Sequence, residues 1–234
     1  TLSYIYIKPS CIDFTKIKFS KRLANNFLSA SFYLTISAIS IIFLSRTDQI
    51  MIKSMLTNFD LGNYSASQKI VEVSYIIPTI LMSSILPKII EKLNSGIEEQ
   101  NLFLARLFKI VVLSSIIVSA LIFLSSDALI LLIFGNKFIL SSKLLRIYSF
   151  CIIFYSIKVS FQQVLYAKGL EKNIMFQSIF TFIINVILNY FLIDYHGVYG
   201  AVYATLISLV FSSIIYDFFD KDLRKFIKYK FLLS

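Results

Sequence analysis

Long runs of uncharged, mostly apolar residues follow one another along the chain, separated by short polar stretches. Three of these runs are continuous, at residues 27–45, 174–193 and 198–216. Three more, at about 61–90, 104–126 and 142–167, contain few charges and reach a similar length. A helix needs about 20 such residues to cross the hydrocarbon core of a bilayer. The pattern therefore predicts six membrane-spanning helices, with a separate short apolar piece at 128–134 that ends at the turn sequence FGNKF.

The same runs argue against β-strands. Their apolar positions are continuous, whereas the strands of a membrane barrel alternate with a period of two. A spanning helix also satisfies its own backbone hydrogen bonds, which lipid cannot do. The predicted fold class is therefore all-α: a polytopic membrane protein whose six transmembrane helices form one bundle.

The composition supports a membrane protein rather than a soluble one. Hydrophobic residues make up 57% of the 234-residue chain, above the roughly 45–50% of soluble domains. The net charge of +10 would suggest a nucleic-acid partner in a soluble protein, but here the basic residues lie between apolar runs, so we expect none. His196 is the only histidine and lies in a short turn, and the chain has no metal-ligand spacing of Cys or His. We therefore expect no metal, no cofactor and no enzymatic activity.

Basic residues gather in alternate connecting segments, which predicts an orientation. Six crossings place both ends of the chain on one side, and the positive-inside rule makes that side cytoplasmic. The basic residues on it are Lys8, Lys16, Lys18, Lys21, Arg22, Lys88, Lys92, Arg106, Lys109, Lys168, Lys172, Lys221, Arg224, Lys225, Lys228 and Lys230. The expected organisation is a basic cytoplasmic segment (1–26), a six-helix transmembrane bundle (27–219) and a basic cytoplasmic tail (220–234).

Charged residues within the apolar segments are candidate functional residues. Each costs roughly 2.5–3.5 kcal/mol at the centre of a membrane helix, so such side chains usually face a bundle interior or a wet cavity. In the first predicted helix Arg46, Gln49 and Lys53 share one face, at about 100° per residue. Asp48 lies about 200° away from Arg46 around the helix, so its partner must come from another helix.

Other segments carry polar positions that match this pattern. Lys69 and Glu72 are three residues apart and can touch, and Pro78 is a candidate hinge because proline removes a backbone donor. On the fourth segment Lys158 and Gln162 share a face. The fifth segment has a polar stripe of Gln177, Thr181, Asn185 and Asn189. Together these stripes predict an aqueous cavity in which cations outnumber anions.

Such a cavity suits an anionic substrate, for example a phosphate or diphosphate group. The substrate-binding candidates are Arg46, Lys69, Lys158, Gln49 and Gln162. Asp48 and Glu72 are candidates for ion coupling or for counter-ions, with Lys69 as one cation that Asp48 could pair with. The alternative is purely structural: cations at the membrane interface, an isolated ion pair and interhelical hydrogen bonds.

Three stretches together resemble the Wzx-type polysaccharide flippases of the multidrug/oligosaccharidyl-lipid/polysaccharide exporter superfamily. They are RTDQIMIKSMLTNFDLGNYSASQKIVEVSYIIPTILMSSILPKI (46–89), IFGNKFILSSKLLRIYSF (133–150) and NVILNYFLIDYHGVYGAVYATLIS (185–208). The family's corresponding patterns are an R-x-D-Q-I-M-I core followed by G-x-Y-S-A, an F-G-x-x-[FY] turn, and N-x-x-x-N followed by G-x-x-G-A-x-x-A-T. The three matches occur in the family's order and cover most of residues 44–208.

The resemblance implies a fold and a function. Members have two six-helix bundles around a central cavity, and this chain would be the C-terminal bundle. They move oligosaccharide repeat units linked to undecaprenyl diphosphate across the bacterial cytoplasmic membrane, by alternating access driven by an ion gradient. The motif matches carry Arg46, Asp48 and Lys69 over as cavity residues. The implied partners are the lipid-linked oligosaccharide and membrane lipid, with a polysaccharide polymerase as a further candidate.

Two other functions stay open. A drug or small-molecule exporter of the same superfamily would share the fold, but many of its substrates are cationic, and the excess of Lys and Arg argues against it. A membrane enzyme of polysaccharide assembly would need catalytic residues on a substantial external loop, and the predicted external loops are short.

Overall fold

The structure, a computed structural model, describes residues 21–219 and 224 and is built from long helices. The predicted basic segment 1–26 and tail 220–234 lie mostly outside the described residues. Within those residues the fold is all-α and contains no strand, as the continuous apolar runs predicted. The helices are α1 (Lys21–Met55), α2 (Asn58–Leu93), α3 (Ile97–Phe134), α4 (Ile139–Tyr148), α5 (Cys151–Ala167), α6 (Glu171–His196), α7 (Val198–Val210) and α8 (Tyr216–Phe219).

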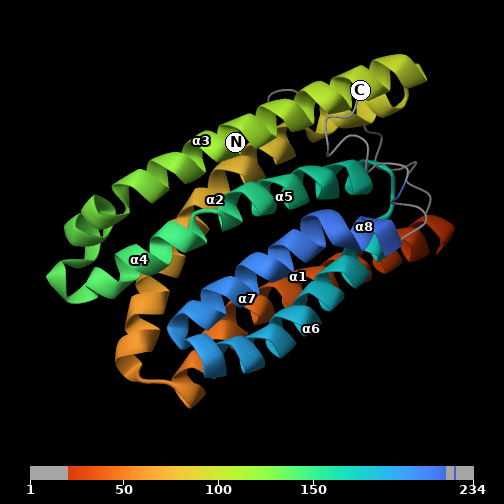
Figure 1. The fold of residues 1–234 in the computed structure, drawn as a ribbon. Helices are drawn as coiled ribbons and strands as arrows, with labels where there is room; N and C mark the ends of the chain where they lie inside the picture. The colour runs from red at the N-terminus through yellow and green to blue at the C-terminus, as the bar shows by residue number, and fades with distance from the viewer. Residues whose placement is uncertain (1–20, 220–223, 225–234) are drawn as a thin grey trace, which may run out of the picture.

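The helices form two groups that lie side by side (Figure 1). One group contains α1, α6 and α7, and the other contains α2, α3, α4 and α5; within each group the helices pack mainly on one another. Contacts of α2 with α1, and of α7 with α4 and α5, join the groups. The middle of the bundle therefore lies between two layers of helices, where a cavity can form.

Five helical segments are long and apolar enough to cross a membrane, and the α4–α5 pair makes a sixth if it is counted as one span. The fourth predicted span is thus broken: α4 and α5 meet at an angle of 47°. Large apolar side chains cover the outside of the helices, and Leu124 and Leu132 of α3 are 79% and 84% exposed. Lipid is the solvent that such a surface needs.

Two boundaries differ from the prediction. The piece 128–134 is not separate, because α3 continues without a break to Phe134; only then does Gly135, at φ +81°, turn the chain into a 3-10 turn at Asn136–Phe138. In the sixth span the α-helix ends at Val210 and widens into a π-helical turn at Phe211–Ile215. Neither change shows in apolar periodicity, since an uncharged run looks the same across a helix junction.

Local sequence signals determine the two tight turns α1–α2 and α6–α7. Both turns lie at the end of the bundle opposite the α2–α3 and α5–α6 connections. The α2 helix begins at a capping box, in which the Thr57 hydroxyl accepts from the Asp60 backbone N–H and the Asp60 carboxylate accepts from the Thr57 N–H. The α6–α7 turn contains Gly197 at φ +57°. Close to it, a Cβ on Gly200 would lie 1.9 Å from the Leu192 carbonyl oxygen, so only glycine lets α7 approach α6 this closely.

Candidate functional site

A cavity of about 220 Å³ lies between the two groups of helices. Residues from α1, α2, α4, α5 and α7 line it, and its polar lining consists of Ser45, Asp48, Gln68, Glu72, Tyr75, Tyr148, Tyr155, Lys158, Gln162 and Thr205. The structure thus brings four predicted site residues, Asp48, Glu72, Lys158 and Gln162, to the wall of one cavity. The other three, Arg46, Gln49 and Lys69, line a second hollow of about 310 Å³.

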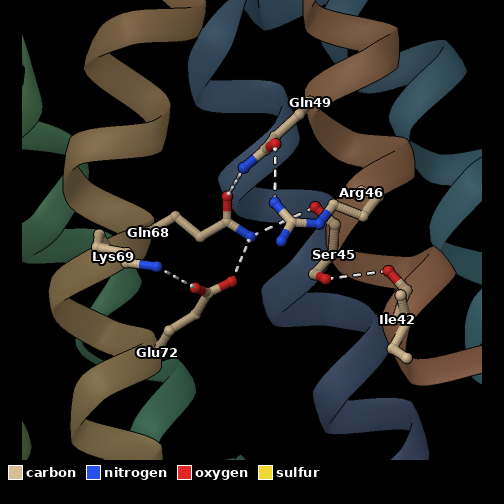
Figure 2. A network of polar contacts seen from close by, with 7 residues as sticks. All are labelled: Ile42, Ser45, Arg46, Gln49, Gln68, Lys69 and Glu72. Atoms are coloured by element: carbon tan, nitrogen blue, oxygen red, sulfur yellow. Dashed lines mark hydrogen bonds and ion pairs between the residues drawn. The ribbon is translucent and has the colours of Figure 1, made fainter. Parts of the chain in front are cut away.

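A chain of side-chain contacts separates the two hollows (Figure 2). Gln49 donates to the Gln68 amide oxygen at 2.9 Å, and Gln68 in turn donates to the Glu72 carboxylate at 3.1 Å. Arg46 reaches the Gln49 amide oxygen at 3.5 Å, and Lys69 lies 4.0 Å from Glu72. Gln68 and Glu72 line both hollows, so these two side chains form the partition between them.

The two cations next to these side chains, Arg46 and Lys69, line the second hollow. Arg46 is exposed, and the Lys69 side chain is 71% exposed and extends toward its ion pair with Glu72 (Figure 2). The predicted Lys69–Glu72 contact therefore forms. In this structure the predicted cations do not share one cavity, because α1 and α2 touch through Gln49 and Gln68 and divide the space.

Asp48 points to the opposite side of α1, into the protein core. Its carboxylate is fully buried and accepts three hydrogen bonds: from Asn189 of α6 at 2.6 Å, from Tyr64 of α2 at 2.7 Å and from Thr205 of α7 at 2.9 Å. Asn189 also donates to Asn185 one turn away, at 2.9 Å. The carboxylate is thus held by neutral dipoles from three helices.

Of the two roles expected for Asp48, pairing with a lysine is the one that the structure contradicts. Within the described residues no Lys or Arg forms an ion pair with this carboxylate, and Lys69 faces the other hollow. The physical reason is the helical twist: the two residues that follow Arg46 carry the chain about 200° around α1, so Asp48 faces α6 and α7 instead of the cationic edge of α2. The predicted polar stripe of α6 also lies away from the central cavity. Its residues Asn185 and Asn189 are fully buried and are not among the residues that line that cavity.

Lys158 is the cation of the central cavity. Its side chain is 6% exposed, and it makes no hydrogen bond or ion pair with any residue of the described part of the chain. Gln162, one turn further along α5, is 7% exposed, and its amide nitrogen likewise has no partner there. Two buried donors thus lie on one face of α5, beside a pocket, without protein acceptors.

Stacked aromatic rings border this pocket. Tyr75 of α2 and Tyr155 of α5 have centroids 3.8 Å apart and planes within 13° of each other, and the Tyr155 hydroxyl lies 3.3 Å from the Thr79 hydroxyl. These contacts hold α5 against α2. Pro78 lies in the same stretch of α2, inside a helix that the structure shows as continuous, so a hinge there stays a prediction.

Sequence reasoning missed Tyr64, Tyr148 and Thr205 as site residues. Tyr64 donates to Asp48, Tyr148 lies 3.1 Å from the Tyr64 hydroxyl and lines the cavity, and Thr205 completes the carboxylate's donors. A signal was present: Tyr64 belongs to the GNYSA motif and Thr205 to the GAVYAT motif. Uncharged partners of a buried carboxylate leave no charge pattern in the sequence, so only membership of these motifs marks them.

A family model now adds to this geometry. The model of the lipid II flippase MurJ matches residues 12–233, nearly the whole chain. The chain belongs to the lipid II flippase MurJ family. A comparison with the sequences of curated proteins gives no match.

Two solved structures share the fold. One is an outward-facing MATE family multidrug resistance transporter of the MOP superfamily, with a TM-score of 0.71 and 14% sequence identity. The other is a MOP superfamily transporter from Pyrococcus furiosus, with a TM-score of 0.69 and 14% identity. Each comparison covers 87% of this chain and 50% of the other, so the chain spans about half the length of these transporters. Membership of a flippase family and a multi-pass transporter fold are thereby shown; the predicted Wzx type is a finer assignment that the MurJ match does not carry.

Proposed function

We propose that this chain forms the C-terminal bundle of a flippase that moves an undecaprenyl-diphosphate-linked saccharide across the bacterial cytoplasmic membrane by alternating access. Residues 27–219 form that bundle, with both ends of the chain in the cytoplasm. The MurJ family match and the transporter fold support the general activity. The nature of the cargo rests on the chemistry of the central cavity.

Lys158 is the observation that carries the proposal. A buried ammonium without a counter-ion is costly in a low-dielectric interior, so it is retained where a ligand supplies the missing negative charge. A diphosphate offers charge and several acceptor oxygens to Lys158 and to the unpartnered Gln162 amide. Arg46 and Lys69, on the other side of the partition, offer further positive charge to the same group when α1 and α2 separate.

Asp48 supports ion coupling. Three neutral donors stabilise its carboxylate but do not cancel its charge, so a bound proton or metal cation is what neutralises it. Its donors come from α2, α6 and α7, so a change in the charge of this one group alters contacts between both helix groups. That is the property a coupling site needs if an ion gradient is to drive the change between inward-open and outward-open states.

Two saccharide cargoes fit this chemistry. The sequence motifs favour an oligosaccharide repeat unit of a surface polysaccharide, and the family model favours lipid II, the peptidoglycan precursor. We propose the repeat unit, because three motifs in order support it. A cationic drug is the competing cargo, because the carboxylates of Asp48 and Glu72 line the same cavity as Lys158. We rank it lower because Glu72 pairs with Lys69 and Asp48 is held by neutral donors, whereas Lys158 has no partner within the described residues.

The experiment compares the three cargoes in vesicles that contain the complete transporter and an imposed ion gradient. We expect movement of the lipid-linked repeat unit, and a loss of at least about tenfold when Lys158→Met removes the charge, with partial activity for Lys158→Arg. The exposed Lys172→Met is the matched control and should transport normally. Movement of lipid II but not of the repeat unit would contradict the cargo, and normal transport by Lys158→Met would contradict the anion site.

The orientation has its own test. Single cysteines introduced at Asn136 and His196, which lie at the α3–α4 and α6–α7 turns, should react with an impermeant thiol reagent added outside intact cells. A cysteine at Asn173, near the start of α6, should not react. External labelling at Asn173 would reverse the proposed orientation.

A further inference from the structure

Three hollows meet end to end along α2. The second hollow, which contains Arg46 and Lys69, borders a third hollow of about 340 Å³ between α2 and α3, and Lys69 and Phe134 line both. The third hollow borders a fourth, of about 70 Å³, and Ser74 lines both of these. Shared lining residues therefore join the three hollows into one passage. We name its third and fourth hollows together the α2–α3 groove.

The groove follows the helical repeat of two helices that run in opposite directions (Figure 1). Positions four apart on α2 share one face of the helix, and so do positions three or four apart on α3. The lining includes Val73, Ile77 and Leu81 of α2 and Val111, Val118 and Ile122 of α3. From Lys69 to Met82 the groove extends about 20 Å along α2, at about 1.5 Å per residue.

Small side chains keep the inner end of the groove open. Ser74 of α2, Ser114 and Ser115 of α3 and Ser156 of α5 line the fourth hollow. Each of these hydroxyls donates to a carbonyl of its own helix, at distances from 2.7 Å to 3.0 Å. A hydroxyl whose proton is already bonded needs no further partner in the hollow. The inner end is therefore narrow, and it suits an apolar group.

The outer end of the passage has the opposite chemistry. In the second hollow Arg46 forms no ion pair with any described residue, and the carboxylate of Glu72 is the partner of Lys69. One positive charge in this hollow is thus left without a counter-ion. A ligand with an anionic head and a long apolar tail would match both ends of the passage at once.

The shape of the passage selects a lipid with one chain. The fourth hollow, at about 70 Å³, has room for a single chain, whereas a glycerophospholipid has two. A polyprenyl diphosphate has one chain and a more highly charged head. In the proposed orientation Lys69 lies nearer the outside than Met82, so a lipid in this passage points as lipids of the outer leaflet do.

We propose that the α2–α3 groove holds the polyprenyl chain of the lipid-linked cargo while the diphosphate lies in the second hollow. This inference rests on the proposed flippase function and adds the place of the cargo's apolar part. The chain leaves one apolar surrounding, lipid, for another, so close packing and not the hydrophobic effect determines its binding. The groove thereby keeps the diphosphate next to Arg46 and Lys69.

The first test maps the chain in vesicles that contain the complete transporter. A photoreactive amino acid is introduced singly at Val73 or Ile77 of the groove, and radiolabelled undecaprenyl diphosphate is the probe. Ile76 and Ile80 are the matched control positions, because they are similarly exposed on α2 but do not line the groove. We expect labelling at the groove positions to exceed that at the controls at least about fivefold.

Unlabelled lipids added in excess identify the occupant. Undecaprenyl diphosphate should abolish labelling at Val73 and Ile77. Geranyl diphosphate, which has the same head and a short chain, should compete at least about fivefold more weakly, because it packs against less of the groove. Phosphatidylglycerol, which is anionic but has two chains, should not compete. Equal competition by phosphatidylglycerol, or equal labelling of groove and control positions, would overturn the proposal.

A second test fills the groove. The variant is Val73→Trp with Ser114→Phe, and the matched control is Ile76→Trp with Ile117→Phe; all four positions are exposed, so neither variant overpacks the core. We expect transport of the lipid-linked repeat unit to fall at least about tenfold in the groove variant and to stay normal in the control. Normal transport by the groove variant would overturn the proposal. Failure of the proposed function looks different, because Lys158→Met would then transport normally, whichever positions the lipid labels.

Discussion

Asp48 and Lys158 are both buried charged groups in the same bundle, but their surroundings differ in kind. Asp48 accepts three hydrogen bonds from neutral side chains on three helices. Lys158 has no partner in the described residues and borders a cavity of about 220 Å³. The carboxylate is held by side chains of three other helices, whereas the ammonium has no protein acceptor within the described residues. This difference is the basis for the roles proposed above, ion coupling for Asp48 and anion binding for Lys158, because a buried charge without partners is costly and one with hydrogen-bond donors is stabilised.

The largest effect is expected from a substitution that disturbs the packing of α6 and α7 beside Asp48. Gly200→Ala would place a Cβ 1.9 Å from the Leu192 carbonyl oxygen, so α7 must move away from α6. We expect destabilisation at the upper end of about 1–3 kcal/mol or beyond, with a sharp fall in folded protein. Thermal unfolding in detergent measures it. Gly62→Ala is the control, since its Cβ meets only a side-chain atom at 3.7 Å and should be tolerated.

Asp48→Asn is expected to have the next largest effect. It removes the charge that the three donors stabilise, so we expect a loss of roughly 1.5–3 kcal/mol in stability and a loss of gradient-driven transport. Transport with and without an imposed gradient, beside protein abundance, measures both. Exposed Asp194→Asn should change neither. Normal transport and normal stability in Asp48→Asn would remove this carboxylate from the coupling mechanism.

Lys158→Met should change stability in the direction opposite to Asp48→Asn. Removing an unpaired buried charge relieves its desolvation, so we expect the folded protein to gain stability on the order of 1 kcal/mol while it loses anion binding. Melting temperature with and without a diphosphate lipid tests this. A large loss of stability would show that Lys158 has a structural partner and that the contrast with Asp48 is unfounded.

The smallest expected effect is the difference in stability between two tyrosine variants, Tyr64→Phe and Tyr148→Phe. Tyr64→Phe removes a donor to the Asp48 carboxylate at 2.7 Å, whereas Tyr148→Phe removes a hydroxyl that lies 3.1 Å from the Tyr64 hydroxyl. Hydrogen bonds to a charged group contribute about 1.5–3 kcal/mol and neutral ones about 0.5–1.5 kcal/mol. We expect Tyr64→Phe to destabilise the protein more. The reverse order in thermal unfolding would mean that Tyr148 is the main donor at this site.

Much of the architecture followed from residue order alone. Continuous uncharged runs such as 174–193 and 198–216 predicted spanning helices, because lipid accepts no unpaired backbone and few charges. The motifs in 46–89, 133–150 and 185–208 predicted the transporter fold and the flippase superfamily, which the family and fold comparisons support. Helical geometry correctly turned Asp48 away from Arg46, since the angle per residue is fixed in any α-helix.

The partners across helices were decided only by the tertiary structure. Asn189 and Thr205 lie 141 and 157 residues from Asp48 in sequence. The motifs mark both residues, but they do not indicate that α6 and α7 close on that carboxylate. The break at α4–α5, the π turn after Val210 and the partition at Gln68 likewise arise from packing. A sequence sets which face of a helix is polar, through the fixed helical repeat. Which other polar face it meets depends on how all the helices share one core, and only the packed molecule settles that.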